Sequence, residues 1–421
     1  MDFQQHPLRS RVLAELHARP FAPLSPPTRI LHFAFLNEGD NAAAAAEALD
    51  RFCASLGEQG PAPGAKHHRL SLSGVRLRFE MHSEFSTFTW EEAAAPGVPF
   101  ATPPDRLMAY MRKVAPPGLL IVAVDLVLAE ESDSSAAAEG VFAADSLAYS
   151  SAEHGAARVA SDFKADPLGL VRILVVSRSL TETQAGALVQ RLLEIETYRT
   201  LALLGLPEAQ ALAPIIRRIE TELPGILDEM RGRDDFDDNH RALDRLTALA
   251  AELEHGAAAS LYRFGATRAY HELVQLRMEA IGEEPIAGHV GWSSFLARRL
   301  SPAIRTCVTT QERQDNLSRK LSRAAQLLRT RVDVDLERQN RDQLQVMNDR
   351  LHLQLRLQQT VEGLSIAAIT YYVVNLIHLM LDGAHQAGLP VNPNVGTAIA
   401  LPVTLLAVAW LVRRIRKRHA A

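Results

Sequence analysis

Cysteine, aromatic residues and short catalytic motifs are all scarce in this sequence. Cys53 and Cys307 are the only cysteines among 421 residues, which excludes a disulfide framework or a thiolate zinc cluster and fits a reducing compartment. Aromatic residues make up 6% of the chain, and abundant alanine favours a helix-rich protein. Phosphate-binding glycine loops, His-Glu-x-x-His and Cys-x-x-Cys are absent. We therefore expect no enzyme activity.

A large excess of charge of one sign is also lacking, because the net charge is only −4. This predicts no nucleic-acid partner. Charged residues make up 22% of the chain and the mean hydropathy is −0.04, which is typical of a soluble protein with a short membrane part.

Two segments near the end contain no charged residue and are long enough to cross a membrane. Residues 363–381 and 395–412 each approach the roughly 20 apolar residues that span ~30 Å of hydrocarbon. The loop 382–394 has no Lys or Arg, whereas the tail 413–421 is basic and suits contact with anionic lipid. Lys and Arg beside membrane segments stay cytoplasmic, so we predict a transmembrane hairpin, 363–412, with both termini in the cytoplasm. The alternative is a helical hairpin buried in a soluble core.

Residues 1–180 mix strand and helix patterns, which predicts an α+β cytoplasmic domain. Alternating apolar residues indicate a half-buried strand over 69–81, with Gly74 as a bulge or turn. The apolar run 119–128 is typical of a central strand covered on both faces. Further strands are expected at residues 29–36, 85–90 and 172–177.

From Thr181 onward the pattern is helical. Residues 181–300 predict a helical region whose first helix starts at Thr181. Residues 301–362 contain no glycine and a single proline near the start, so we predict one stalk helix about 90 Å long that leads into the first span. The spacing of its apolar residues resembles a coiled-coil seam with polar layers, over Leu317, Leu321, Ala324 and Leu328 and again at Met347 and Leu351.

The first span carries a band of polar side chains. At 100° per residue, the band lies within about 140° on a helix. Its members are Ser365, Tyr371, Tyr372, Asn375, His378 and Asp382. Polar groups at membrane depth face protein or water, so the band is either the lining of a pore or relay, or a set of hydrogen bonds between helices. Both interpretations require partner helices and predict a homo-oligomer.

Four carboxylates lie in the polar connector 231–239. They are Asp234, Asp235, Asp237 and Asp238. Carboxylate oxygens suit a hard divalent cation such as Mg²⁺, and the alternative is a solvated loop. No other cofactor is expected.

Long stretches of the chain resemble one bacterial family. They are His6-Pro-Leu-Arg9, Glu15-Leu-His-Ala-Arg-Pro-Phe21, Glu84-Phe-Ser-Thr87, 191–207, 328–332 and 359–365. The family resembled is a group of predicted membrane-anchored proteins, the domain of unknown function 3422. The resemblance implies membrane anchoring, which we expect in the bacterial inner membrane. It carries over no functional residue, because the family has no settled activity.

The order of parts is also similar to that of the CorA-type magnesium channels. Those channels are pentamers whose stalk helices continue into a pore-lining first span. The layout therefore implies a homo-oligomeric cation channel or transporter, pentameric if CorA-like. One departure is that residues 380–385 read Met-Leu-Asp-Gly-Ala-His, without the Gly-Met-Asn of that family. The alternative hypothesis is a membrane-anchored scaffold or regulator whose cytoplasmic domain binds a partner.

Overall fold

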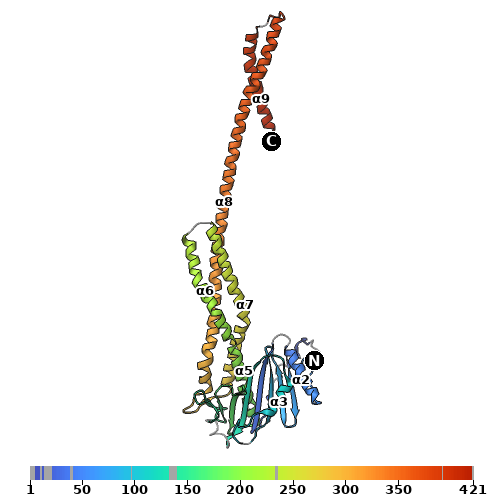
Figure 1. Ribbon diagram of the computed structural model, residues 1–421, viewed down its shortest axis with the longest axis vertical. Helices are drawn as coiled ribbons and strands as arrows, with labels where there is room; N and C mark the ends of the chain where they lie inside the picture. Colours follow the sequence, from blue (N-terminus) through green and yellow to red (C-terminus); the bar gives the residue numbers. More distant parts are fainter. Residues whose placement is uncertain are drawn as a thin grey trace. The chain divides into compact units, whose positions relative to one another are not determined.

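The computed structural model describes residues 5–9, 12–13, 21–37, 41–95, 97–131, 140–232, 236–390 and 392–419. The chain divides into two compact units. The first unit is Met1–Glu229 with Asp244–Ala324, and the second is Met230–Leu243 with Ala325–Ala421. A mixed sheet and a helical bundle make up the first unit, and the second holds the greater part of helix α8 and all of α9 (Figure 1).

Nine strands among the described residues form one sheet in the order β2-β3-β4-β1-β5-β8-β7-β6-β9. The strands are β1 (Thr28–Leu36), β2 (His67–Leu72), β3 (Val75–Met81), β4 (Phe85–Ala93), β5 (Leu120–Glu130), β6 (Ala148–Ala152), β7 (Ala157–Ser161), β8 (Val171–Ser177) and β9 (Glu284–Pro285). Neighbours pair antiparallel, except that β5 and β8 are parallel. The predicted central strand is β5, which is buried almost throughout between β1 and β8.

The strand expected over 69–81 is two strands, because the chain reverses at Gly74. This glycine has a φ of 77°, in the left-handed region that residues with a Cβ rarely adopt. The reversal places Leu70 of β2 opposite Leu77 of β3, and both side chains are buried on the same face.

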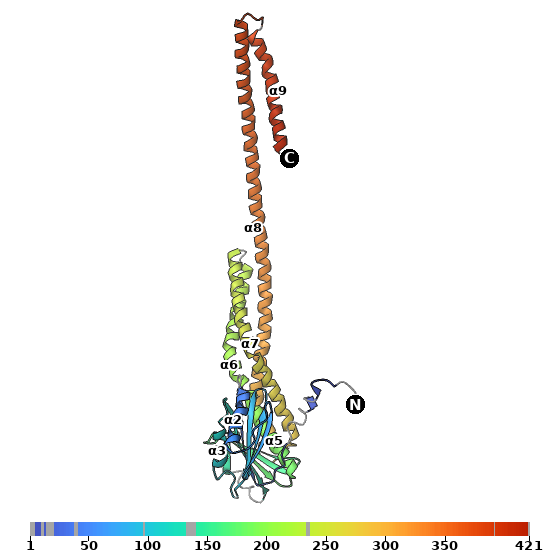
Figure 2. The ribbon, with the colours of Figure 1, turned by 90° about the vertical axis from the view of Figure 1, so that its right-hand side faces the viewer.

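Helices cover both faces of the sheet. The helices of the described residues are α2 (Asn41–Ser55), α3 (Asp105–Val114), α5 (Glu182–Leu203), α6 (Gly205–Gly232), α7 (Phe236–Ala280), α8 (Trp292–Gln386) and α9 (Pro393–His419). Helices α2 and α3 pack on one face around Phe79 and Trp90, and α5 packs on the other around Ile30 and Leu126 (Figure 1 and Figure 2). Helix α5 begins at the predicted place, because Thr181 and Gln184 form a capping box.

Helices α6, α7 and α8 also pack together within the first unit. Glu220 of α6 pairs with Arg313 of α8 at 2.7 Å, and Arg218 of α6 pairs with Glu252 of α7. The predicted stalk is the middle of α8, which starts at Trp292 and continues without interruption to Gln386.

Candidate functional site

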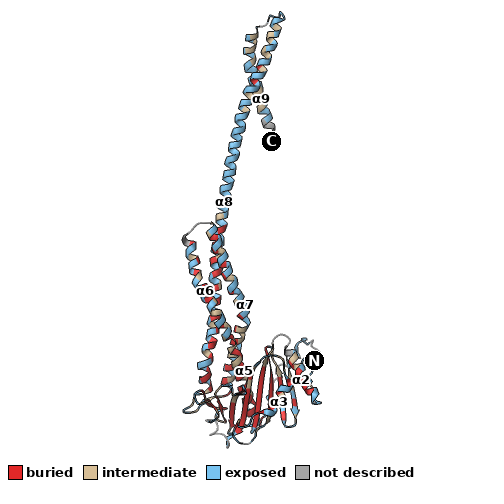
Figure 3. Cartoon of the chain, viewed as in Figure 1, coloured by how far each residue is buried: buried red, intermediate tan, exposed pale blue. Residues whose placement is uncertain are grey.

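The end of α8 and the whole of α9 form a helical hairpin. Both helices contain a segment long and apolar enough to cross a membrane. Only 11% of the apolar window of α8 is buried, and 0% of that of α9, although the core helix of a soluble protein would be mostly buried (Figure 3). The structure therefore gives no support to the alternative of a hairpin buried in a soluble core.

The two helices of the hairpin meet along a narrow contact. Thr370 and Val374 are the buried residues of this part of α8. On α9, a Cβ added to Gly396 would lie 2.6 Å from Cδ1 of Leu381. The glycine thus lets the two backbones approach closely, as small residues do between membrane helices.

A polar pair joins the hairpin at His378. Its Nδ1 lies 2.8 Å from Oγ1 of Thr397, and that hydroxyl donates its hydrogen to the carbonyl of Pro393 at 2.6 Å. Because the hydroxyl hydrogen is already used, Thr397 accepts and Nδ1 of His378 donates. The Nδ1 of His378 and the hydroxyl of Thr397 therefore both have hydrogen-bond partners inside the hairpin.

The predicted polar band divides between two sides of α8. His378 faces α9, and half-buried Asp382 accepts a hydrogen bond from Nε2 of Gln386 at 3.2 Å. The remaining members are exposed, and these are Ser365, Tyr371, Tyr372 and Asn375. The two tyrosines are 69% and 67% exposed. The structure thus brings none of these four side chains into the contact with α9.

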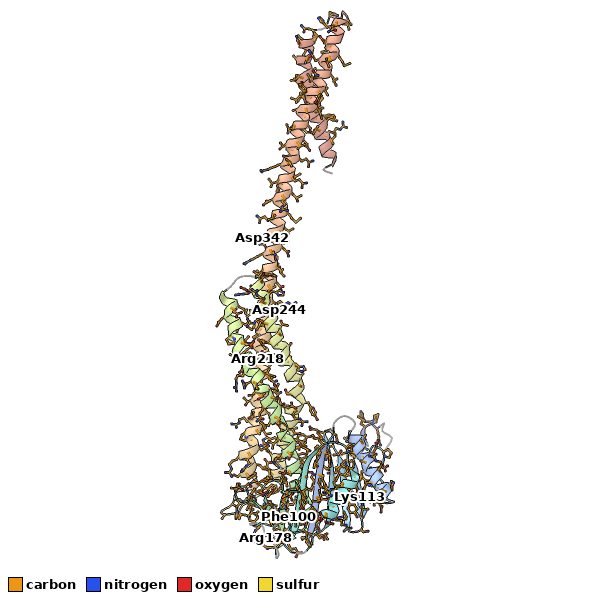
Figure 4. All side chains as sticks on the ribbon, in the orientation of Figure 1. Phe100, Lys113, Arg178, Arg218, Asp244 and Asp342 are labelled. Atoms are coloured by element: carbon orange, nitrogen blue, oxygen red, sulfur yellow. The ribbon has the colours of Figure 1, made fainter. Side chains whose placement is uncertain are left out.

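The part of α8 that precedes the hairpin is a single exposed helix. Two hydrogen bonds join it to the described residues of 230–243: the bond from Arg331 to the carbonyl of Met230, at 2.6 Å, and the bond from Asn239 to Asp335, at 3.2 Å. Beyond them, side chains project on all sides around Asp342 (Figure 4). More than half of each of the following side chains is exposed: Leu344, Val346, Met347, Leu351, Leu353, Leu355, Leu357, Val361 and Leu364.

The acidic connector gives no metal site among the described residues. Asp234 and Asp235 lie outside them. Asp237 is exposed in the first turn of α7, and Asp238 pairs with Arg241 one turn further along. No group of three or more His, Cys, Asp or Glu residues in the described part could hold a metal ion, so Mg²⁺ binding here stays a prediction.

The first unit contains a cleft of about 740 Å³ between the end of α7 and the start of α8. On its rim, the carboxylate of Glu283 accepts hydrogen bonds from the hydroxyl of Ser150 and from the backbone N–H of Ser293, at 3.0 Å for the latter. These bonds fix the start of α8. His271 also lines the cleft, and burial lowers its pKa. The sequence did not indicate this group, because Ser150 lies 133 residues before Glu283 and only the fold brings them together.

A buried ionic cluster ties the sheet to α7. Glu84, the residue before β4, accepts a hydrogen bond from the hydroxyl of Tyr270 at 2.7 Å and pairs with Arg263. Burial and the neighbouring Glu84 carboxylate both raise the pKa of Tyr270. The carboxylate is almost fully shielded from water and has a cationic partner, so the cluster is built to hold two elements together.

His32 is buried where β1 meets α5. Its Nδ1 lies 2.9 Å from Oγ1 of Thr89, and its Nε2 lies 3.0 Å from Oγ1 of Thr197. Thr197 donates to the carbonyl of Leu193 at 2.8 Å, so Nε2 is the nitrogen that carries the hydrogen and Nδ1 accepts from Thr89. Burial lowers the pKa of His32 to about 3, so the imidazole is neutral in this site.

Comparison with known proteins finds one family. The family model described as "Protein of unknown function (DUF3422)" matches residues 4–419. No curated protein and no solved structure matches the chain. The similarity in layout to the CorA-type channels gains no support from these comparisons.

Proposed function

The chain belongs to the DUF3422 family, as the sequence indicates, and we propose that it spans a membrane and assembles from several copies into a pore for small cations. The observation that carries the proposal is the face of α8 that holds Ser365, Tyr372 and Asn375. These hydroxyl and amide groups are exposed, in a segment long and apolar enough to cross a membrane, and they point away from α9.

The energetics of this face demand a partner. An amide or hydroxyl without a hydrogen bond in hydrocarbon costs roughly 2–7 kcal/mol, and lipid tails offer no bond. Helix α9 of the same chain packs around Val374 and Leu381, on the other side of α8. Further copies of α8 would bring their polar faces together around an axis, where water and ions replace lipid.

The charges at the ends of the hairpin favour cations. Asp382 lies at the end that faces the loop, and the loop 382–394 contains no Lys or Arg. In an assembly, the Asp382 carboxylates would form a ring at this mouth and raise the local concentration of cations. Mg²⁺ is one candidate, but the Gly-Met-Asn filter of CorA is absent, so we do not assign its selectivity mechanism to this chain.

The same charges orient the proposed hairpin. Five Lys and Arg residues lie within 413–418, and Arg341, Arg350 and Arg356 precede the first span. By the positive-inside rule, both termini lie on the cytoplasmic side of the bacterial inner membrane, where the basic tail contacts anionic lipid.

The test is cation flux into liposomes that contain the purified full-length protein. Asn375→Leu removes the amide from the proposed lining while keeping the length of the side chain, and we expect flux to fall at least tenfold. Thr404→Val is the matched control, because it removes a polar group from α9 instead, and its flux should equal that of the wild type. The mass of each variant in detergent shows whether assembly is intact. Unchanged flux in an assembled Asn375→Leu variant refutes the pore.

A membrane-anchored scaffold is the second candidate function. The observation in its favour is the open cleft of about 740 Å³ in the first unit, which is large enough for a peptide or small ligand. This function predicts that a chain whose residues 363–412 are replaced by an unrelated two-helix anchor still restores a deletion strain. A pore predicts that the same replacement abolishes function while the protein stays folded.

A further inference from the structure

Residues 341–364 of α8 carry two separate apolar stripes. The first stripe consists of Leu344, Met347, Leu351 and Leu355, and the second of Val346, Leu353, Leu357 and Leu364. At 100° per residue the first stripe spans about 80° and the second about 40°, and their centres lie about 140° apart. All eight side chains are more than half exposed. A two-stranded coiled coil needs one seam, and this helix has two.

We propose that this segment packs against copies of itself in a closed ring of four or more parallel helices. In such a ring each helix touches two neighbours. Because the ring is a closed cyclic assembly, the helices stand at the corners of a regular polygon. Seen from one helix, the directions to its two neighbours therefore differ by about 60° in a ring of three, about 90° in four, about 108° in five and about 120° in six. Two stripes about 140° apart therefore exclude two-stranded packing and disfavour a ring of three.

A second copy of this chain fits both stripes at once. In a cyclic ring the first stripe of one copy meets the second stripe of the next, so one interface repeated around the ring covers every exposed side chain. Burying eight such side chains removes on the order of 500–1,000 Å² of apolar surface per copy, at ~60–120 Å² each. The eight side chains serve two interfaces, one stripe in each, so each partner contributes roughly half of this area to one interface. A stable interface buries about 800 Å² per partner, so the stripes supply a large part of the contact area that each interface needs.

The residues between the stripes indicate which side faces the axis. The two stripes divide the rest of the helix surface into a narrow arc and a wide arc. The narrow arc holds Gln343, Arg350, Gln354 and Val361. The wide arc holds most of the charged residues, among them Asp342 (Figure 4). In a ring the narrow arc faces inward and the wide, charged arc faces solvent.

Residues of the hairpin indicate independently that the same side of α8 faces the axis of the ring. At 100° per residue, Ser365, Tyr372 and Asn375 continue the narrow arc to within about 50° of its centre. Val374 and Leu381, which meet α9, fall on the opposite side of α8. Helix α9 therefore lies outside the ring, and the axis of the stalk ring continues into the pore lining. This last step rests on the proposed function.

Cysteine cross-linking of the full chain in membranes tests the ring. With a short bis-maleimide, the double variant Leu344→Cys with Val346→Cys places one thiol in each stripe and should give a ladder that ends at the closed oligomer. Leu344→Cys alone should give no covalent dimer, because each first stripe meets a second stripe. Asp342→Cys, in the wide arc, is the control and should also give none. Native Cys53 and Cys307 are buried and burial raises the pKa of both thiols, so they react slowly.

Two results would overturn the ring. Efficient dimers from Leu344→Cys alone, with the double variant also ending at dimers, would show a two-stranded coil. No cross-link in any variant would show that something other than a copy covers the stripes. The experiments distinguish failure of the ring from failure of the pore. A full ladder of cross-linked species without cation flux supports the ring and refutes the pore. Cation flux without a ladder supports the pore and refutes the ring.

Discussion

His32 should make the first unit lose stability in mild acid. Burial is the main cause that lowers its pKa from 6.5 to about 3, and the nearby charges of Arg78 and His82 act in the same direction. Both ring nitrogens already have hydroxyl partners that suit the neutral imidazole. Since the pKa in the folded state lies below that in the unfolded state, the unfolded chain binds this proton more tightly.

The sign and size of the effect follow from this difference. The contribution of His32 to the free energy of unfolding is fully present above its unfolded pKa of 6.5 and is lost as the pH falls towards 3. Each pH unit below the unfolded value costs about 1.4 kcal/mol. Between pH 7.5 and pH 5.0, the free energy of unfolding should therefore fall by about 2 kcal/mol through this group.

The assay is urea unfolding of the full-length protein in detergent, followed by tryptophan fluorescence. Trp90 and Trp292 are fully buried in the first unit and report its unfolding. His32→Gln is the comparison, because a neutral amide can still donate and accept but does not titrate. His68 and His271, whose pKa values are also lowered by burial, remain in both proteins and cancel. An equal loss of stability in His32→Gln and wild type would refute the reasoning.

Two further predictions concern a buried pair and the orientation of the hairpin. Asp125→Ala should lower the free energy of unfolding by about 3–5 kcal/mol in the same urea assay, because it leaves Arg29, 2.5 Å away and buried, without its carboxylate. The exposed pair of Asp145 and Lys164 supplies the control, and Asp145→Ala should change little. If both termini are cytoplasmic, Ala387→Cys should react with an impermeant maleimide added to intact spheroplasts, and Asp342→Cys only after lysis. The reverse pattern would contradict the orientation.

The parts of the fold that could be predicted are those whose signal is local. The run that became β5 is apolar except for Asp125 and is typical of a strand covered on both faces, and the capping residues at Thr181 mark a helix start directly. The two apolar segments of the hairpin are equally local, since length and lack of charge identify them. The family resemblance, carried by stretches along the whole chain, is confirmed by the match over residues 4–419.

Other elements could not be predicted, because their cause is tertiary. Strands β6 and β7 consist mainly of alanine and serine, which favour strands weakly. Pairing of β7 with β8, and of β6 with β7, holds them in the sheet. The helical pattern groups His378 with Asn375, but it does not show on which side of α8 the second span packs. That choice depends on Gly396 and Thr397, which lie on the other helix of the hairpin.

The two ends of the sheet limit how copies of this chain can associate. At one end β9 has only two residues, and Pro285 has no N–H to offer an added strand. At the other end β2 carries His67, His68 and Arg69 in succession, which is a poor template for another strand. Crowding many copies together therefore should not lead to sheet extension between neighbours. Many copies of a chain with such edge strands can therefore be present at high local concentration without forming fibrils.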